Sequence, residues 1–400
     1  MENSHMPPQL QNLPSSQQHL LVCLSHLRWQ FVHQRPQHLM SYAARKCRVI
    51  FLEEPIFSED IVGAELRMHN DASGVRVAIP HVPSSISEEN VVEAQRSLLD
   101  QMLEPYADHH ITFWYYTPMA LRFSDHQVPH LCVYDCMDEL SAFRGAPPEL
   151  TLLESRLFDL ADLVFTGGQS LYESKKSRHA SVHAFPSSID KAHFSRARQG
   201  KAADPEDQKH IPRPRIGFFG VVDERMDIDL VAALAGLRPE WQLVMIGPVV
   251  KIDPASLPRR PNIHWLGMKS YAELPAYLAG WDAGFMPFAI NEATRFISPT
   301  KTPEFLAAGL PVVSTPIQDV QRPYGKLGLV GIAATAEEMA AQLETVMSGP
   351  RDEWRKAVDR HLADMSWQST WAAMEHLMRR HARLNVPASE QSARGATAHV

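Results

Sequence analysis

Residues 298–315 read SPTKTPEFLAAGLPVVST, and this stretch decides the fold of the chain's second half. A short helix is predicted in it with Pro303 at its first position, because proline has a helical φ and lacks an N–H group that would be unpaired there anyway. Gly309 can adopt the left-handed conformation that ends a helix, and the apolar run after it predicts a buried strand. Lys301 and Glu304 therefore lie together at the start of a helix that leads into a strand.

This placement of Lys301 and Glu304 predicts a nucleotide site. The free N–H groups and the dipole of a helix N-terminus attract anions. A lysine adds a positive charge for a phosphate, and a carboxylate can accept hydrogen bonds from ribose hydroxyls. A solvated loop lysine and a glutamate that merely caps the helix are the alternative.

Short apolar runs alternate with helical stretches along most of the chain. Buried strands are predicted at residues 20–25, 48–53, 75–80, 111–116, 130–135, 162–167, 215–220, 241–247, 262–267, 281–288, 311–315 and 327–333. Helices are predicted at residues 35–46, 88–103, 148–160, 169–178, 226–236, 271–280 and 335–347. This alternation predicts an α/β fold with two doubly wound, Rossmann-like domains. Their ligands are expected beyond the carboxyl ends of the strands, in the cleft between the domains.

The stretch 196–214 is polar, contains proline and lacks periodicity, so it is the predicted linker. Near the end of the chain, Trp367 and Trp371 begin a helically spaced apolar set that predicts a core-packed helix. Both chain ends are polar and predicted to be disordered. The predicted division is a tail at 1–17, a first domain at 18–195, a linker at 196–214, a second domain at 215–365, a final helix at 366–384 and a tail at 385–400.

Composition argues against several classes of protein. The formal net charge of -7 gives no support to nucleic-acid binding, which favours a basic face. The four cysteines form no CxxC pair and lie in apolar runs, as expected of reduced thiols in a cytoplasmic protein. We expect neither a signal peptide nor a membrane-spanning helix, since no apolar run approaches about 18 residues. The histidines lack metal-binding spacing and the one DxD, at 227–229, falls in a predicted helix, so no metal site is expected.

The stretch 298–315 resembles the donor-nucleotide motif of GT-B glycosyltransferases of the large group 1 family. Four further stretches carry the resemblance, which extends from His19 to Leu377: HLRWQFVHQRPQHL, VYDCMDELSAF, GFFGVVDERMD and MIGPVVKID. The resemblance implies the GT-B fold, with the first domain on the acceptor side and the second binding a nucleotide sugar. It also implies that the final helix crosses back onto the first domain.

The chain departs from the family's pattern at one position. The family often has a second glutamate eight positions before the ribose-binding one, where it faces the donor sugar. Phe296 stands there in this chain. The missing contact would then come from Asn291, Glu292 or Thr294.

The resemblance implies a donor site in the second domain. Gly220 ends a strand, and a glycine there lets the backbone approach a pyrophosphate without a Cβ in the way. Arg225, expected at the start of the next helix, and Lys301 would stabilise charge on the leaving diphosphate. Leu266 and Gly267 would read the base through backbone groups. The predicted donor-site residues are Gly220, Arg225, Gly247, Lys251, Leu266, Gly267, Thr300, Lys301 and Glu304.

The acceptor is expected against the first domain, where a polar and aromatic cluster follows the first strand. Such a cluster is costly to bury unless it binds something, and sugars suit it because their apolar faces stack on aromatic rings. The alternative is a loop packed by Trp29 and ion-paired through Arg35. The predicted sugar- and acceptor-binding residues are His26, Arg28, Trp29, Arg35, Asp138, Asn291 and Thr294.

Asp135 and Asp138 follow another strand end and are expected to face the cleft. Asp135 lies nearer the strand, so it is the predicted general base for an acceptor hydroxyl. Contact with the donor sugar and surface aspartates in a turn are the alternatives. A general base would permit inversion at the anomeric carbon, whereas most of the resembled family retains the configuration, and the sequence leaves this open.

These residues together predict a cytoplasmic hexosyltransferase whose co-substrate is a UDP-, GDP- or ADP-sugar, with no metal ion or cofactor. The resemblance implies a role in polysaccharide or cell-envelope glycan synthesis on a glycan or lipid-linked acceptor. The basic run SKKSRH, 174–179, is the predicted point of peripheral contact with anionic lipid at the inner face of the membrane. A nucleotide-sugar epimerase of the same fold and a non-catalytic, two-lobed binding protein are the alternatives.

Overall fold

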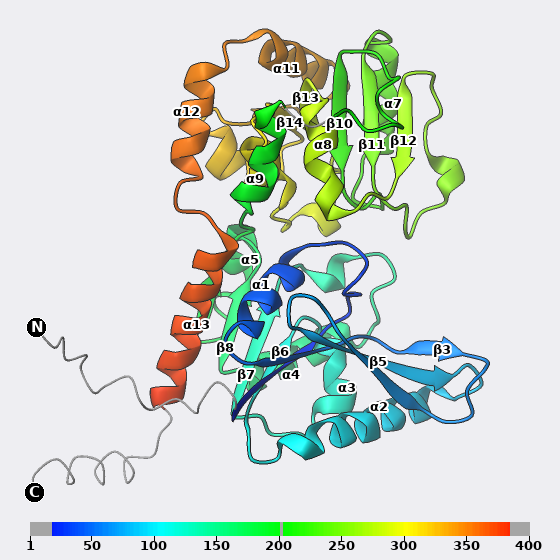
Figure 1. Cartoon of the computed structure of the whole chain (residues 1–400), viewed down its shortest axis with the longest axis vertical. Coiled ribbons are helices and arrows are strands. Elements are labelled where there is room, and N and C mark those ends of the chain that lie inside the picture. The colour runs from blue at the N-terminus through cyan, green and yellow to red at the C-terminus, as the bar shows by residue number, and fades with distance from the viewer. Residues whose placement is uncertain (1–17, 201–202, 385–400) are drawn as a thin grey trace, which may run out of the picture.

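The computed structural model describes residues 18–200 and 203–384, which form two α/β domains stacked along the long axis of the molecule (Figure 1). The predicted tails, 1–17 and 385–400, lie outside the described residues. The strands of the first domain are β1 (His19–Leu24), β2 (Arg48–Leu52), β3 (Ile56–Ser58), β4 (Glu65–Asn70), β5 (Arg76–Pro83), β6 (His110–Tyr115), β7 (Leu131–Cys136), β8 (Leu163–Thr166) and β9 (Val182–Ala184). Its helices are α1 (Arg35–Ala44), α2 (Glu88–Leu103), α3 (Leu121–Ser124), α4 (Leu150–Leu160), α5 (Gln169–Lys175) and α6 (Lys191–Phe194).

The second domain repeats this arrangement with a smaller sheet. Its strands are β10 (Arg215–Phe219), β11 (Gln242–Ile246), β12 (Ile263–Gly267), β13 (Ala283–Met286), β14 (Val312–Ser314) and β15 (Gly331–Ile332). Its helices are α7 (Ile228–Leu237), α8 (Leu274–Ala279), α9 (Lys301–Ala307), α10 (Gln318–Val320), α11 (Ala336–Ser348) and α12 (Asp352–His361), followed by the final helix α13 (Trp367–Leu384).

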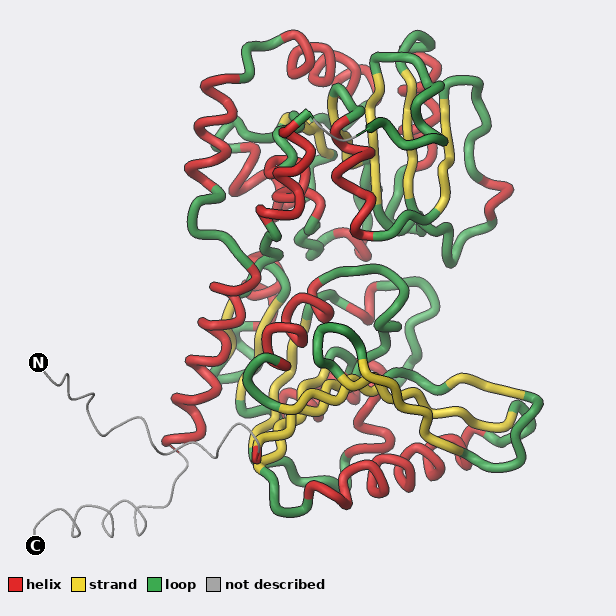
Figure 2. The backbone as a smooth tube through the Cα atoms, in the orientation of Figure 1, coloured by secondary structure: helices red, strands yellow, loops and turns green. Residues whose placement is uncertain are grey.

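The sheets are parallel except for one strand. The first sheet runs β3-β5-β2-β1-β6-β7-β8-β9, with β4 antiparallel to β5, and the second runs β12-β11-β10-β13-β14-β15. Parallel neighbours need crossover connections, so helices cover both faces (Figure 2). The carboxyl ends of both sheets point toward the space between the domains (Figure 1). The predicted pair of doubly wound domains is confirmed.

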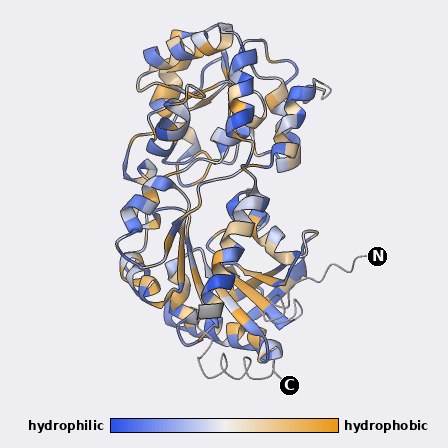
Figure 3. Cartoon of the chain, turned by 90° about the vertical axis from the view of Figure 1, so that its left-hand side faces the viewer, coloured by the Kyte–Doolittle hydropathy of each residue, from blue (hydrophilic) through white to orange (hydrophobic). Residues whose placement is uncertain are grey.

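The central strands have unbroken apolar sequences because both of their faces are buried in the core. Residues Leu20 to Leu24 of β1 are all 0% exposed, because helices pack on both faces of the sheet. Hydropathic colouring shows the same pattern, with apolar strands inside and polar helix faces outside (Figure 3).

Helix α13 packs against the first domain although it follows the second domain in the sequence. Its Trp367, Trp371 and Met374 belong to one buried cluster with Leu21 and Trp114 of the first sheet. Figure 1 shows α13 beside α1, whereas α12 lies on the upper domain. The chain therefore crosses between the domains twice, and the second crossing is anchored by large apolar side chains.

Several local predictions need correction. Helix α9 begins at Lys301, so Pro303 is its third residue and not its first. Helix α7 begins at Ile228, which leaves Arg225 in the loop before it. The predicted strand at 327–333 is reduced to β15, because residues 326–330 form turns and bends that follow a π-helical turn at Gln321–Gly325. Strands β3, β4 and β9 were not predicted.

The stretch 203–214 is not a free tether. Gln208 is 0% exposed, accepts a hydrogen bond from Trp281 Nε1 at 2.7 Å and donates one to the Tyr277 carbonyl at 3.1 Å. Its neighbour Asp207 accepts hydrogen bonds from the Tyr277 hydroxyl and from Lys269. The polar composition that predicted a linker instead supplies partners for the second domain.

The basic run 174–179 is mostly engaged within the first domain. Lys175 is 4% exposed and its ammonium lies 2.9 Å from a Glu154 carboxylate oxygen and 2.8 Å from one of Glu139. Arg178 also pairs with Glu154 and lies 4.1 Å from the ring centroid of Phe158. Two charges of the predicted lipid-contacting cluster are therefore neutralised within the first domain, and contact of the cluster with anionic lipid stays a prediction. Within the described residues, no helix is both long and apolar enough to span a membrane.

Candidate functional site

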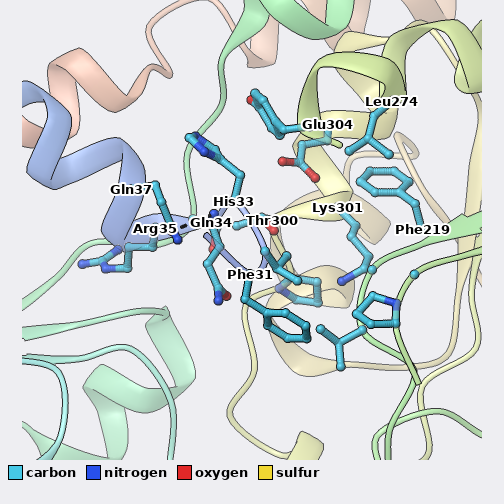
Figure 4. Close-up of a pocket in the computed structure, with 18 of the residues that line it drawn as sticks. Phe31, His33, Gln34, Arg35, Gln37, Phe219, Leu274, Thr300, Lys301 and Glu304 are labelled. Atoms are coloured by element: carbon cyan, nitrogen blue, oxygen red, sulfur yellow. Dashed lines mark hydrogen bonds between the residues drawn. The ribbon is translucent and has the colours of Figure 1, made fainter. Parts of the chain in front are cut away.

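A cavity of about 560 Å³ lies between the two domains at the carboxyl ends of both sheets. Nine of the predicted site residues line it: Trp29, Arg35, Asp138, Gly220, Arg225, Gly247, Thr300, Lys301 and Glu304. Figure 4 shows Lys301 and Glu304 reaching into this pocket from α9, with Phe31 and His33 reaching in from the first domain. The structure thus brings the donor and acceptor predictions to one place.

Two glycines, Gly220 and Gly247, form part of the second-domain side of the cavity. Gly220 follows β10 with φ of +130°, and Gly247 follows β11 with φ of +145°, values that L side chains rarely adopt. A Cβ on Gly247 would collide with the Gly220 carbonyl oxygen, and a Cβ on Gly220 would collide with the end of the Lys301 side chain. The glycines are therefore required by the close approach of two strand ends and of one lysine.

Lys301 and Glu304 face the pocket without hydrogen-bond partners. Neither side chain forms a hydrogen bond or an ion pair with any residue that the structure describes, although Glu304 is only 7% exposed. Burial raises the pKa of the Glu304 carboxyl above its usual range, and burial together with the nearby Arg225 charge lowers the pKa of the Lys301 ammonium. Burying such charged groups costs free energy unless a ligand forms hydrogen bonds or ion pairs with them.

Arg225 is held in place by a carboxylate that the sequence reasoning missed. Its Nε and Nη2 donate to the two carboxylate oxygens of Asp223, at 3.0 to 3.1 Å and 2.7 Å. Its guanidinium also lies 5.4 Å from the ring centroid of Phe143 in the first domain. No acceptor among the described residues takes a hydrogen bond from Nη1, so this edge stays available at the pocket. The DER order of residues 223–225 was the available signal.

Asp135 does not face the cleft, and the prediction that it is a general base is wrong. Its carboxylate is 0% exposed and accepts two hydrogen bonds from Arg35 Nε, at 3.0 and 3.2 Å, and one from Nη2 at 2.8 Å. Arg35 Nη1 donates to the Phe185 carbonyl at 2.7 Å. The expected packing alternative for Arg35 thus holds: one bidentate, buried ion pair ties α1 to β7 and occupies both groups.

Asp138, three residues later, is the carboxylate that reaches the cavity. Its side chain has no hydrogen bond or ion pair with the described residues. Burial raises its pKa to about 6, although the Arg225 and Arg35 charges act in the opposite direction. A carboxyl group with this pKa is ionised at neutral pH and can take a hydrogen bond from a hydroxyl.

The loop after β1 is fixed by a buried glutamate. One carboxylate oxygen of Glu53, 4% exposed, accepts from the Trp29 backbone N–H at 2.8 Å, and the other accepts from Arg28 Nη1 at 3.0 Å. Gln37 donates to the Trp29 carbonyl at 2.9 Å. Trp29 therefore lines the cavity as a packed residue, whereas the Arg28 charge is directed toward Glu53 and away from the cleft.

Other predicted site residues lie outside the cavity. The Lys251 ammonium lies 5.4 Å from the Phe143 ring centroid, and His26 is held neutral by burial, which lowers its pKa to about 4. Leu266 packs on the second-domain core, and the Gly267 carbonyl accepts a hydrogen bond from Gly247. The wall beside them is formed instead by the next three residues of the chain, Met268, Lys269 and Ser270.

Asn291 and Thr294 do not replace the missing glutamate. They cap a short turn and satisfy each other, with Thr294 N–H donating to Asn291 Oδ1 and Asn291 N–H donating to Thr294 Oγ1, each at 3.1 Å. Neither lines the cavity. Phe296 itself packs against the apolar cluster of the first domain. The departure from the family's pattern thus serves contact between the domains.

Several aromatic residues that were not predicted as site residues also line the cavity, and Phe31 and Tyr271 are two of them. Phe31 is 39% exposed there, and its place in the quoted stretch HLRWQFVHQRPQHL was the available signal. The Tyr271 ring stacks on His193 with centroids 4.1 Å apart, and its hydroxyl is buried without a partner among the described residues. No local sequence pattern marked Tyr271.

The described residues contain no group of three or more His, Cys, Asp or Glu side chains arranged to hold a metal ion. Asp227, in the DxD sequence, is the N-cap of α7 and accepts a hydrogen bond from the Leu230 N–H at 2.8 Å. The four cysteines are free thiols.

The fold is similar to that of solved sugar-transferring proteins. The α,α-trehalose-phosphate synthase of Burkholderia xenovorans, solved with glucose-6-phosphate, superposes with a TM-score of 0.66 at 11% identity over 90% of this chain and 100% of that one. Anabaena HepE, solved with UDP and glucose, gives a TM-score of 0.61 at 12% identity over 90% of this chain and 99% of that one. The molecule therefore has the GT-B fold.

Sequence comparison places the chain more narrowly. Residues 213–349 match the family model for glycosyl transferases group 1. TuaH of Bacillus subtilis, a proposed teichuronic acid biosynthesis glycosyltransferase, is 26% identical over 292 residues, which cover 66% of this chain and 71% of TuaH. The chain is thus similar to group 1 glycosyltransferases over its second domain, and to TuaH over about two thirds of its length.

Proposed function

We propose that this glycosyltransferase moves a sugar from a nucleoside-diphosphate sugar to a hydroxyl group of a glycan acceptor, without a metal ion. The observation that carries the proposal is the pair Lys301 and Glu304. Both line the cavity and neither has a hydrogen bond or an ion pair among the described residues. A ligand with a diphosphate and a vicinal diol would satisfy both.

The donor lies against the second domain in this proposal. Lys301 and the free edge of Arg225 contact the diphosphate, and Gly220 lets its oxygens approach the backbone. Glu304 accepts hydrogen bonds from the ribose hydroxyls. As the bond from the sugar to the diphosphate breaks, negative charge grows on the leaving group, and the two cations stabilise it. This charge compensation is the reason that we propose a metal-independent reaction.

The acceptor hydroxyl lies near Asp138. The carboxylate accepts a hydrogen bond from that hydroxyl, fixes its direction toward the anomeric carbon and lowers the energy of losing its proton. NMR of the anomeric proton of the product distinguishes retention from inversion. An inverted product whose formation is lost in Asp138→Asn would make Asp138 the base.

An envelope or capsular glycan is the acceptor class that we propose. The support is the similarity to TuaH, which is named for teichuronic acid biosynthesis. The acceptor can be a free glycan end or a lipid-linked one.

The test incubates the protein with UDP-, GDP- or ADP-sugars in the presence of glycan acceptors. Turnover is measured as release of the nucleoside diphosphate. We expect one base to be strongly preferred, transfer to persist in EDTA, and both transfer and nucleotide release to fall in Glu304→Gln. An epimerised nucleotide sugar as the product would support the alternative reaction. No turnover with any of the donors would overturn the proposal.

A further inference from the structure

The first-domain wall of the cavity contains one arginine and no lysine among the described residues. That arginine is Arg35, whose side chain is 4% exposed and whose charge is compensated by Asp135. The neighbouring Arg28 is directed to Glu53 and to the carbonyl oxygens of Glu54 and Pro55. This wall therefore presents no uncompensated positive charge.

The same wall presents two carboxylates, Asp71 and Asp138, together with neutral polar groups. Asp138 reaches the cavity without a hydrogen-bond or ion-pair partner among the described residues, and Gln30 and Gln34 also line it. His33 is neutral at physiological pH, because burial lowers its pKa to about 4. On the opposite wall, Lys269 is paired with Asp207, so Lys301 and the Nη1 edge of Arg225 are the groups that a donor diphosphate would engage. A phosphate on the acceptor would thus face Asp138 with no cation left to neutralise it.

Phe31 supplies an apolar surface at this wall. Its ring is 39% exposed, lines the cavity and comes from the loop after β1 (Figure 4). This loop is rigidly held, since the Trp29 N–H and carbonyl are bound by Glu53 and Gln37. An aromatic ring fixed at the edge of a polar cavity is suited to stack on the apolar face of a pyranose.

We infer that the acceptor is an uncharged pyranose that stacks on Phe31 with a hydroxyl directed to Asp138, and not a sugar phosphate. This inference rests on the proposed function and specifies its acceptor. Phe31 is then the residue that selects an uncharged ring face, while Asp138 rejects anionic groups.

The test measures acceptor binding by saturation-transfer NMR with UDP present. The probes are methyl glycosides of glucose, galactose, N-acetylglucosamine and N-acetylgalactosamine, compared with glucose 6-phosphate and galactose 6-phosphate. We expect at least one glycoside to bind and each sugar phosphate to bind more weakly than its glycoside. Phe31→Ala should weaken glycoside binding about 3- to 10-fold, and Phe31→Trp should preserve it.

Phe57→Ala is the matched control, because Phe57 is a phenylalanine of β3 that is 54% exposed but does not line the cavity. It should leave glycoside binding unchanged, and all variants should bind UDP with the wild-type Kd. Preference for the sugar phosphates, binding of no glycoside, or equal effects of the two alanine variants would overturn the inference. Failure of wild type to bind any nucleotide would instead remove the proposed function on which it rests.

Discussion

The two walls of the cleft use charge in opposite ways. On the second-domain wall, Lys301 and Glu304 have no hydrogen-bond or ion-pair partner among the described residues. On the first-domain wall, Arg35 and Asp135 form a buried bidentate ion pair that fixes a helix to a strand. An unpaired buried charge destabilises the fold unless a ligand of opposite charge or a hydrogen-bonding ligand pairs with it. A complete ion pair has no free group with which to bind a ligand. The unpaired charges of the donor wall therefore serve ligand binding at the expense of stability, whereas the Arg35–Asp135 pair at the acceptor wall serves stability.

The largest expected effect concerns the stability of the first domain. Removal of one partner from a buried ion pair leaves the other charge uncompensated and costs about 3–5 kcal/mol. We expect Asp135→Ala to lower the free energy of unfolding by this amount in urea denaturation.

Asp138→Ala is the matched control, since Asp138 is a carboxylate three residues away that forms no ion pair with the described residues. Burial disfavours its charge, so its removal should leave stability unchanged or raise it at neutral pH. A stable but inactive Asp135→Ala variant, together with an unstable Asp138→Ala variant, would contradict the structural role of Asp135 and the functional role of Asp138.

The next effect concerns catalysis on the donor wall. We expect Lys301→Ala to lower kcat/KM for the nucleotide sugar by about 10²–10³, because a preorganised charge aimed at the leaving diphosphate is lost. Lys269 lines the same cavity, but its ammonium lies 2.6 Å from Asp207 Oδ2. Lys269→Ala should therefore stay near the wild-type value in steady-state assays. Equal losses in the two variants would show that Lys301 has no special role.

Gly220 allows a more specific test of the same wall. A methyl group there would displace the end of the Lys301 side chain, and misplacement by about 1 Å can lower the rate up to about 10²-fold. We expect Gly220→Ala to lower kcat by a large part of this roughly 10²-fold range.

The double variant Gly220→Ala/Lys301→Ala separates this cause from backbone strain. If the methyl group acts through Lys301, it should have little further effect on kcat once the lysine is absent. Fully additive losses would instead assign the role of Gly220 to the backbone. Gly328→Ala should be harmless to turnover, because Gly328 also has a positive φ but a methyl group there would meet no atom within 4 Å.

The smallest expected effect is a pH dependence from Asp138. The raised pKa, about 6, means that the carboxylate is present above this pH and is lost as the pH falls through it. Transfer to the acceptor should then fall by up to about tenfold per pH unit below 6. In Asp138→Asn this acidic limb should vanish from the pH profile of kcat/KM for the acceptor. An unchanged limb would assign it to another group.

The two walls also differ in how far the sequence predicts them. Lys301, Glu304 and the strand-ending glycines lie in short stretches whose local order sets their positions, so the donor wall could be predicted from a motif. The Arg35–Asp135 pair joins residues 100 positions apart, and the Lys175–Glu154 pair joins residues 21 apart. Sequence alone does not show which charged groups meet, so it predicted a base at Asp135 and did not reveal that two charges of the run 174–179 are paired within the first domain. The fold itself was predictable because strand and helix patterns are local.

The most direct test of the central claim is calorimetry of UDP, GDP and ADP with the wild-type protein and with Lys301→Ala. The claim is that the unpaired charges of the second-domain wall form a nucleoside-diphosphate site. We predict that wild type binds at least one of the three nucleotides and that Lys301→Ala loses about 1.5–3 kcal/mol of that binding, the range for a hydrogen bond to a charged group. Binding of none of the three by wild type, or equal binding by the two proteins, would contradict the account.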